Sequence, residues 1–189
     1  MSATRSVDKR ERLVDAARVL FHHKGFGETS LAEIARESGV PVGNVYYYFK
    51  TKEDIAAAVI AEHSAYLGTI ARQAEKLPAP RERIVSMLDS MACNCGSIAD
   101  SGCPIGSPCT EFGKRDTALR EDANLLLLKI VNWVQRQFEE MGRRDAHELA
   151  IQPVSYTHLR AHAPVLDLVS RLLLEKNKNN TTQTSKPAI

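Results

Sequence analysis

The chain has 189 residues, 43% of them hydrophobic and 25% charged, with a formal net charge of +2. This length allows a sizeable buried core, in one large domain or two small ones. No apolar run approaches the about 18 residues that span a bilayer, and the N-terminus has no signal-peptide core, so we expect a soluble, cytoplasmic protein rather than a membrane-spanning or exported one.

The small basic surplus lies at the N-terminal end. Residues 1–52 hold nine Lys and Arg against six Asp and Glu, whereas residues 53–189 hold sixteen against seventeen. A local basic surplus is typical of a nucleic-acid-binding surface, but an ordinary solvated surface explains so small an excess about as well. The surplus therefore supports a DNA-binding motif without being able to replace one.

The first predicted helix runs from Asp8 to Lys24, after a disordered arm over residues 1–7. Its apolar residues fall at helical spacing and form one buried stripe: Leu13, Ala16, Ala17, Leu20 and Phe21. Gly25 ends this helix, and we expect Phe26 to fill the core of a three-helix unit. Basic residues near the helix start are candidates for phosphate contacts or for ordinary solvation: Arg5, Lys9, Arg10 and Arg12.

A second, short helix is predicted to begin after Ser30. Ser30 and Glu33 have the spacing of a capping box, in which each side chain bonds the backbone of the other residue. Helical spacing of apolar residues follows, at Leu31, Ile34 and Ala35. Gly39 can adopt positive φ and stop the helix.

A third helix is predicted from Pro41 to Phe49, because proline suits the first turn of a helix. Val45 and Phe49 share one face and are expected to be buried. The other side carries Val42, Gly43, Asn44, Tyr46, Tyr47 and Tyr48. Two helices joined by a tight, Gly-containing turn form a helix-turn-helix, and phenols beside Lys50 and Lys52 suit contact with a phosphate backbone. Core packing is the alternative for the tyrosines, and it is the less favoured one for Tyr46 and Tyr47.

At these residues the chain resembles the TetR family of bacterial transcriptional regulators. The matching residues are Thr29-Ser30, Ile34-Ala35, Ser38-Gly39-Val40, Gly43, Val45-Tyr46, Tyr48-Phe49 and Lys52. The resemblance is close over the first third of the chain and covers only the general layout of the rest. It implies an all-α fold, with a helix-turn-helix DNA-binding domain over residues 1–52 and a helical ligand-binding and dimerisation domain over residues 53–152.

The resemblance also implies a function and its partners. We expect a ligand-responsive repressor, not an enzyme and without a cofactor, that binds a palindromic operator in double-stranded DNA as a homodimer. A small-molecule inducer of unknown identity would relieve repression. The alternative classes are a thiol oxidoreductase, which lacks a C-x-x-C motif, and a helical module that binds only protein.

The resemblance assigns roles to single residues. It places Val42, Gly43 and Tyr47 near the bases, and it places Thr29, Tyr46, Tyr48 and Lys52 among the phosphate contacts. From its chemistry, Asn44 offers the donor and acceptor that suit adenine, and Val42 can touch a thymine methyl group. Pro41 stands where the family often has Ser or Thr, and Tyr48 stands where His is common, so no relative's operator can be transferred.

Four further helices are predicted: from about Lys52 to Glu75, from Arg81 to Cys93, from about Ala118 to Met141, and from Asp145 to Gln152. The candidate ligand-binding residues on this half are Tyr66, Met87, Met91, Phe112, Leu126 and Trp133, although plain core packing is the commoner role for such residues. The stretch LLLLKIVNWV is apolar on more than one side, which favours a dimer surface there over a core helix of a monomer.

Four cysteines lie together at Cys93, Cys95, Cys103 and Cys109. Only the first two have the tight spacing of a zinc-ligand pair, so no metal site is assigned to them. A thiol sensor and simple half-buried side chains at helix ends remain alternatives. The spacing of His158 and His162 also suits a metal on a helix, but no carboxylate or cysteine completes a site.

The C-terminal segment departs from the pattern. Pro153 interrupts the last predicted helix, because a proline inside a helix costs about 3 kcal/mol. The following VSYTHLRAH…VLDLVSRLLLEK resembles an adaptor-derived peptide that recurs at the ends of unrelated sequences. We therefore expect the native sequence to end near Gln152, with residues 153–189 non-native or atypical.

Overall fold

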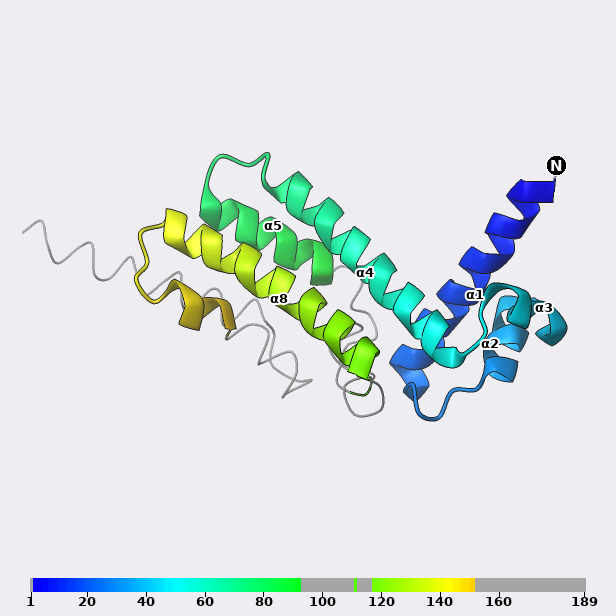
Figure 1. Cartoon of the computed structure of the whole chain (residues 1–189). Coiled ribbons are helices and arrows are strands. Elements are labelled where there is room, and N and C mark those ends of the chain that lie inside the picture. Colours follow the sequence, from blue (N-terminus) through cyan, green and yellow to red (C-terminus); the bar gives the residue numbers. More distant parts are fainter. Residues whose placement is uncertain (1, 93–110, 112–116, 152–189) are drawn as a thin grey trace, which may run out of the picture.

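The computed structural model describes residues 2–92, 111 and 117–151. The cysteine cluster, Phe112, both histidines of the proposed i, i+4 pair and residues 152–189 lie outside the described residues. Every regular element in the described ranges is an α-helix, which confirms the all-α class (Figure 1). The elements are α1 (Ser2–Lys24), α2 (Leu31–Ser38), α3 (Val42–Tyr48), α4 (Lys52–Ala74), α5 (Pro80–Ala92) and α8 (Thr117–Glu140). A last helical segment begins at residue 146.

The helix α1 is longer than its apolar stripe. It begins at Ser2, so the prediction of a disordered arm is wrong for residues 2–7. The segment from Ser2 onward contains no Gly or Pro, and it continues a helix whose later turns are fixed by packing, which favours extension. The apolar stripe itself is confirmed, since Leu13, Ala17 and Phe21 are buried.

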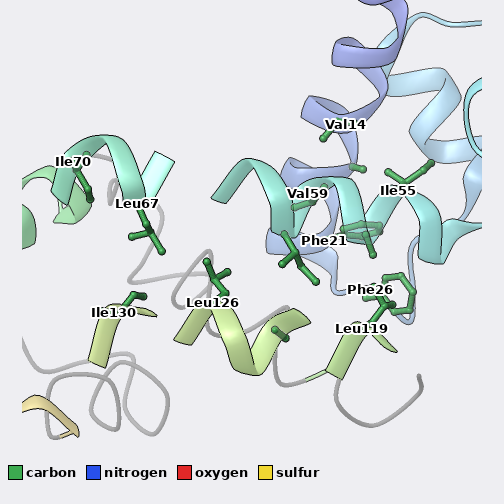
Figure 2. Packing of buried hydrophobic residues seen from close by; sticks show 14 of the residues in the cluster. Val14, Phe21, Phe26, Ile55, Val59, Leu67, Ile70, Leu119, Leu126 and Ile130 are labelled. Carbon is green, nitrogen blue, oxygen red and sulfur yellow. The ribbon is translucent and has the colours of Figure 1, made fainter. Parts of the chain in front are cut away.

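The long helix α4 joins the two halves of the molecule (Figure 1). Its first turns pack against α1, with Ile55 and Val59 lying near Phe21 in Figure 2. Its later turns pack against α5 and α8, where Leu67 and Ile70 are buried. One long helix therefore contributes buried residues along its whole length to a continuous hydrophobic core.

Polar contacts tie the α4–α5–α8 bundle together at its far end. Trp133 Nε1 donates to Glu75 Oε1 at 3.0 Å. Arg83 donates from Nη1 to Glu140 Oε2 at 2.8 Å and from Nε to the Leu77 carbonyl at 2.8 Å. None of the helices in the described residues is both long enough and apolar enough to cross a membrane.

A half-buried histidine, His63, lies where α4 faces α1. Burial and, to a smaller extent, the charges of Arg18 and His22 on α1 lower the pKa of His63 from 6.5 to about 4. The His63 Nε2 atom is buried and has no hydrogen-bond partner among the described residues. At neutral pH the imidazole is therefore uncharged, and between about pH 4 and pH 6.5 the folded chain does not bind the second ring proton that the unfolded chain binds.

This burial makes stability depend on pH. Because the unfolded chain binds the proton below about 6.5 and the folded chain only below about 4, stability falls across that window as the pH falls, by up to about 3 kcal/mol. Chemical unfolding measured from pH 7 to pH 4 tests this. In His63→Leu this part of the loss should disappear, whereas His23→Gln, at an exposed position of α1, should keep it. An equal loss in both variants would contradict the assignment.

Candidate nucleic-acid interface

Local sequence fixes the position of α2. Ser30 accepts from the Glu33 amide while Glu33 accepts from the Ser30 amide, which confirms the predicted capping box. Gly39 ends the helix in the left-handed conformation, at φ 64°, where a β-carbon would be strained. Arg12 donates to the Ser38 carbonyl at this helix end, so its guanidinium supports the fold.

The helix α3 packs against the core through one apolar side. Val45 and the following Phe49 are buried, as predicted, and the guanidinium of Arg10 lies 5.1 Å from the centre of the Phe49 ring. Pro41 is the residue that precedes the first turn, and Lys50 Nζ donates to the Tyr46 carbonyl at the last turn. The rest of the helix is therefore free to face outward.

The outward side of α3 carries the residues that the sequence marked for DNA. Tyr47 is 77% exposed, Tyr46 50% and Val42 46%, and Asn44 and Gly43 are exposed as well. Tyr48 is half-buried, packs against the core and stands edge-to-face with Tyr47, with ring centres 5.0 Å apart. Tyr48 thus supports the orientation of the Tyr47 ring.

Two of the expected phosphate contacts are engaged inside the protein. The Thr29 side chain is buried, and its hydroxyl donates to the Gly25 carbonyl at 2.7 Å. Lys52 Nζ donates to the carbonyls of Phe26 and Thr29, both at 2.7 Å. The expected phosphate roles of these two side chains do not fit their contacts, because both stabilise the turn between α1 and α2.

A carboxylate from a distant part of the chain binds the same turn. Glu111 Oε2 accepts from the Gly27 amide at 3.1 Å, across 84 residues of sequence. A β-carbon on Gly25, which has φ 89°, would lie 2.8 Å from Glu111 Oε1. Sequence reasoning missed Glu111, because no local pattern signals a contact over that separation.

The candidate ligand-binding residues in the described parts of the chain differ in how deeply they are buried. Met87, Leu126 and Trp133 are buried in the core, and Met91 is partly buried against it. Tyr66 is 37% exposed and its hydroxyl donates to the Ser90 carbonyl at 2.8 Å. An open hollow of about 540 Å³ lies along α5 and is lined by Arg81, Glu82, Val85, Ser86, Asp89 and Ser90.

The fold and the exposed face of α3 define a helix-turn-helix protein with a second, helical domain. Residues 13–59 match the family model of "Bacterial regulatory proteins, tetR family", so this part of the chain is similar to that family. The transcriptional regulator LmrA of Bacillus subtilis is 34% identical over 117 residues, which are 60% of this chain and 62% of that protein. The relatives AcrR of Shigella flexneri and HbdR of Aromatoleum sp. are also named transcriptional regulators, at 29% and 36% identity over 44% and 41% of this chain.

Solved structures agree over a larger part of the chain. A TetR transcriptional regulator from Legionella pneumophila is 20% identical, covers 88% of this chain and 95% of its own, and has a TM-score of 0.76. The regulator FadR from Bacillus subtilis, solved in complex with stearoyl-CoA, is 17% identical, covers 86% and 95%, and has a TM-score of 0.62. These likenesses show the fold, while the chain spans less than two thirds of LmrA.

Proposed function

We propose that the protein is a DNA-binding transcriptional regulator, a repressor that binds a palindromic operator as a homodimer. One observation carries the proposal: α3 buries Val45 and turns Val42, Asn44, Tyr46 and Tyr47 outward. Exposed rings and an exposed amide on the second helix of a helix-turn-helix suit the major groove and its flanking phosphates. A regulator of bacterial genes acts in the cytoplasm, where the chromosome lies.

A second copy of the chain is the partner that we propose for α8. Leu125 is 57% exposed and Leu128 52% exposed, one turn apart on the same side of the helix. Residues 145–152 follow α8, so the dimer surface would extend along this end of the molecule. A single recognition helix buries little surface, and helix-turn-helix proteins gain affinity by reading two half-sites as dimers.

We further propose that a small molecule, bound in the helical domain, controls DNA binding. A ligand can do so only by favouring one relative arrangement of the two DNA-binding domains of the dimer over another. Two contacts support such coupling, because Lys52 of α4 and Glu111 both hold the turn after α1. The fold likeness to FadR with stearoyl-CoA is consistent with a ligand in this domain but does not indicate which ligand this chain binds.

Selection of bound sequences from random duplex DNA tests the main proposal. We expect a palindromic sequence with two equal half-sites, bound by two copies of the chain in sedimentation of the complex. Affinity should fall linearly with salt on a log-log scale, because bound phosphates release counterions. A chain that enriches no duplex, and whose only partners are proteins bound without this salt dependence, would instead be a protein-binding module.

A further inference from the structure

The outward face of α3 bears no charged side chain. The helix reads VGNVYYY, and its exposed residues are Val42, Gly43, Asn44, Tyr46 and Tyr47. Bidentate Arg or Lys contact with guanine is the commonest specific contact in the major groove. The helix therefore lacks the usual reader of a G·C pair.

The basic residues near α3 either bind carbonyl groups of the protein or belong to another helix, so α3 itself offers no charged side chain to the bases. Lys50 Nζ donates to the Tyr46 carbonyl, and Lys52 binds the turn after α1. Arg36 is exposed but belongs to α2, the helix that crosses the phosphate backbone in helix-turn-helix complexes. The side chains left to read base edges on α3 are therefore uncharged: aliphatic Val42, the Asn44 amide and the Tyr47 phenol.

Gly43 lies in the middle of this exposed face. At about 100° per residue, the helix places Gly43 between Val42 and Tyr46 on one side and Asn44 and Tyr47 on the other. Gly43 does not have positive φ, and a β-carbon there would meet nothing within 4 Å. The fold therefore does not require glycine at this position, although glycine lowers helix stability by about 1 kcal/mol relative to alanine.

The short side chains beside Gly43 explain why a glycine is useful there. Val42 and Asn44 reach base edges only if the helix backbone comes close to the groove, and a bare glycine allows that approach. Tyr46 and Tyr47 are longer and flank this point, so the Tyr46 hydroxyl can extend to a phosphate while the Tyr47 ring can lie beside the bases. The first turn of α3 would thus contact base edges closely, and Tyr46 on its second turn would contact the phosphate backbone of the DNA.

We infer that α3 recognises A·T base pairs in each half-site, with Val42 against a thymine methyl group and Asn44 on an adenine edge. Gly43 permits the approach. This inference rests on the proposed DNA-binding function and narrows it to a class of operator. The chemistry matches, since the thymine methyl offers apolar contact and adenine offers a donor and an acceptor to a carboxamide.

Base analogues test the two contacts in the operator obtained by selection. Uracil in place of thymine removes only the methyl group, and we expect about fourfold weaker binding at one position of each half-site, the effect of one buried methyl group. Val42→Ala should be insensitive to uracil at that position. Likewise, 7-deazaadenine removes one acceptor, and Asn44→Ala should be insensitive to it at one adenine.

Gly43→Ala tests the close approach. We expect at least about tenfold weaker operator binding together with an unchanged or higher melting temperature, because alanine favours the helix. Gly68→Ala is the matched control, since Gly68 lies in the middle of α4, far along the chain from α3, and its change should leave operator affinity unaltered. Tighter or equal binding by Gly43→Ala would overturn the close approach.

The outcomes separate this inference from the function on which it rests. Failure to enrich any duplex would overturn the proposed function itself. A defined palindromic operator whose affinity is unchanged by every uracil and 7-deazaadenine substitution would leave the function standing and overturn only the A·T assignment. The same holds if the positions sensitive to Val42→Ala and Asn44→Ala prove to be G·C pairs.

Discussion

Replacing Tyr47 by alanine is expected to weaken operator binding about 30-fold, the effect of losing one energetically dominant contact of an interface. Tyr47 is 77% exposed, so its ring contributes little to the core and the thermal unfolding midpoint should hardly change. The edge-to-face contact with Tyr48 is the interaction within the protein that is lost. Titration of labelled operator and a thermal melt of the same sample give both quantities.

Two controls sharpen the result for Tyr47. Tyr47→Phe keeps the ring and removes the hydroxyl, so the difference between the two variants measures the hydroxyl contact. Tyr66→Ala removes a partly exposed tyrosine of α4 and should leave operator affinity unchanged. A large drop in the melting temperature of Tyr47→Ala, with affinity per folded molecule unchanged, would assign the ring to packing.

Replacing Lys52 by methionine is expected to lower the free energy of unfolding by about 3 kcal/mol, because charged hydrogen bonds are lost and carbonyls are left unpaired. The ammonium donates to the Phe26 and Thr29 carbonyls and lies 4.4 Å from the centre of the Phe26 ring. Methionine keeps the apolar stem and removes these interactions. Denaturant unfolding followed by circular dichroism measures the loss.

The matched control for Lys52 is its neighbour Lys50, which is exposed and donates to the carbonyl of Tyr46. Lys50→Met should change the unfolding free energy by less than about 1 kcal/mol. If Lys52 instead contacts phosphate, Lys52→Met would keep its stability and the salt dependence of operator binding would lose about one unit of slope. That pattern would restore the role first expected from the family resemblance.

The helix-turn-helix could be predicted from sequence because its signals are local. Ser30 and Glu33 cap α2, Gly39 ends it, and Val45 with Phe49 defines the buried edge of α3. Each of these signals depends on residues within five positions of one another. For the same reason the outward orientation of Tyr46 and Tyr47 followed from the sequence alone.

The roles of Thr29, Lys52 and Glu111 could not be predicted in this way. Motif position made Thr29 and Lys52 phosphate contacts, whereas the structure shows both bound to the turn after α1. The long Lys52 side chain can reach either solvent or a nearby carbonyl, and the choice depends on where α4 crosses the turn, whereas the Thr29 hydroxyl bonds a carbonyl four residues earlier that no capping or apolar pattern marks. Glu111 meets Gly27 across 84 residues, a separation at which local patterns carry no information.

The sequence by itself determined the presence of the helices, both ends of α2 and the face that α3 buries, because capping, glycine conformation and apolar periodicity act over one or two turns. Only the tertiary structure decided which polar groups meet. Lys52 and Glu111 bind the same turn after α1, His63 lies against α1, and Trp133 donates a hydrogen bond to Glu75. These contacts depend on how three long helices cross, and the crossing is set by the packing of all their buried side chains together.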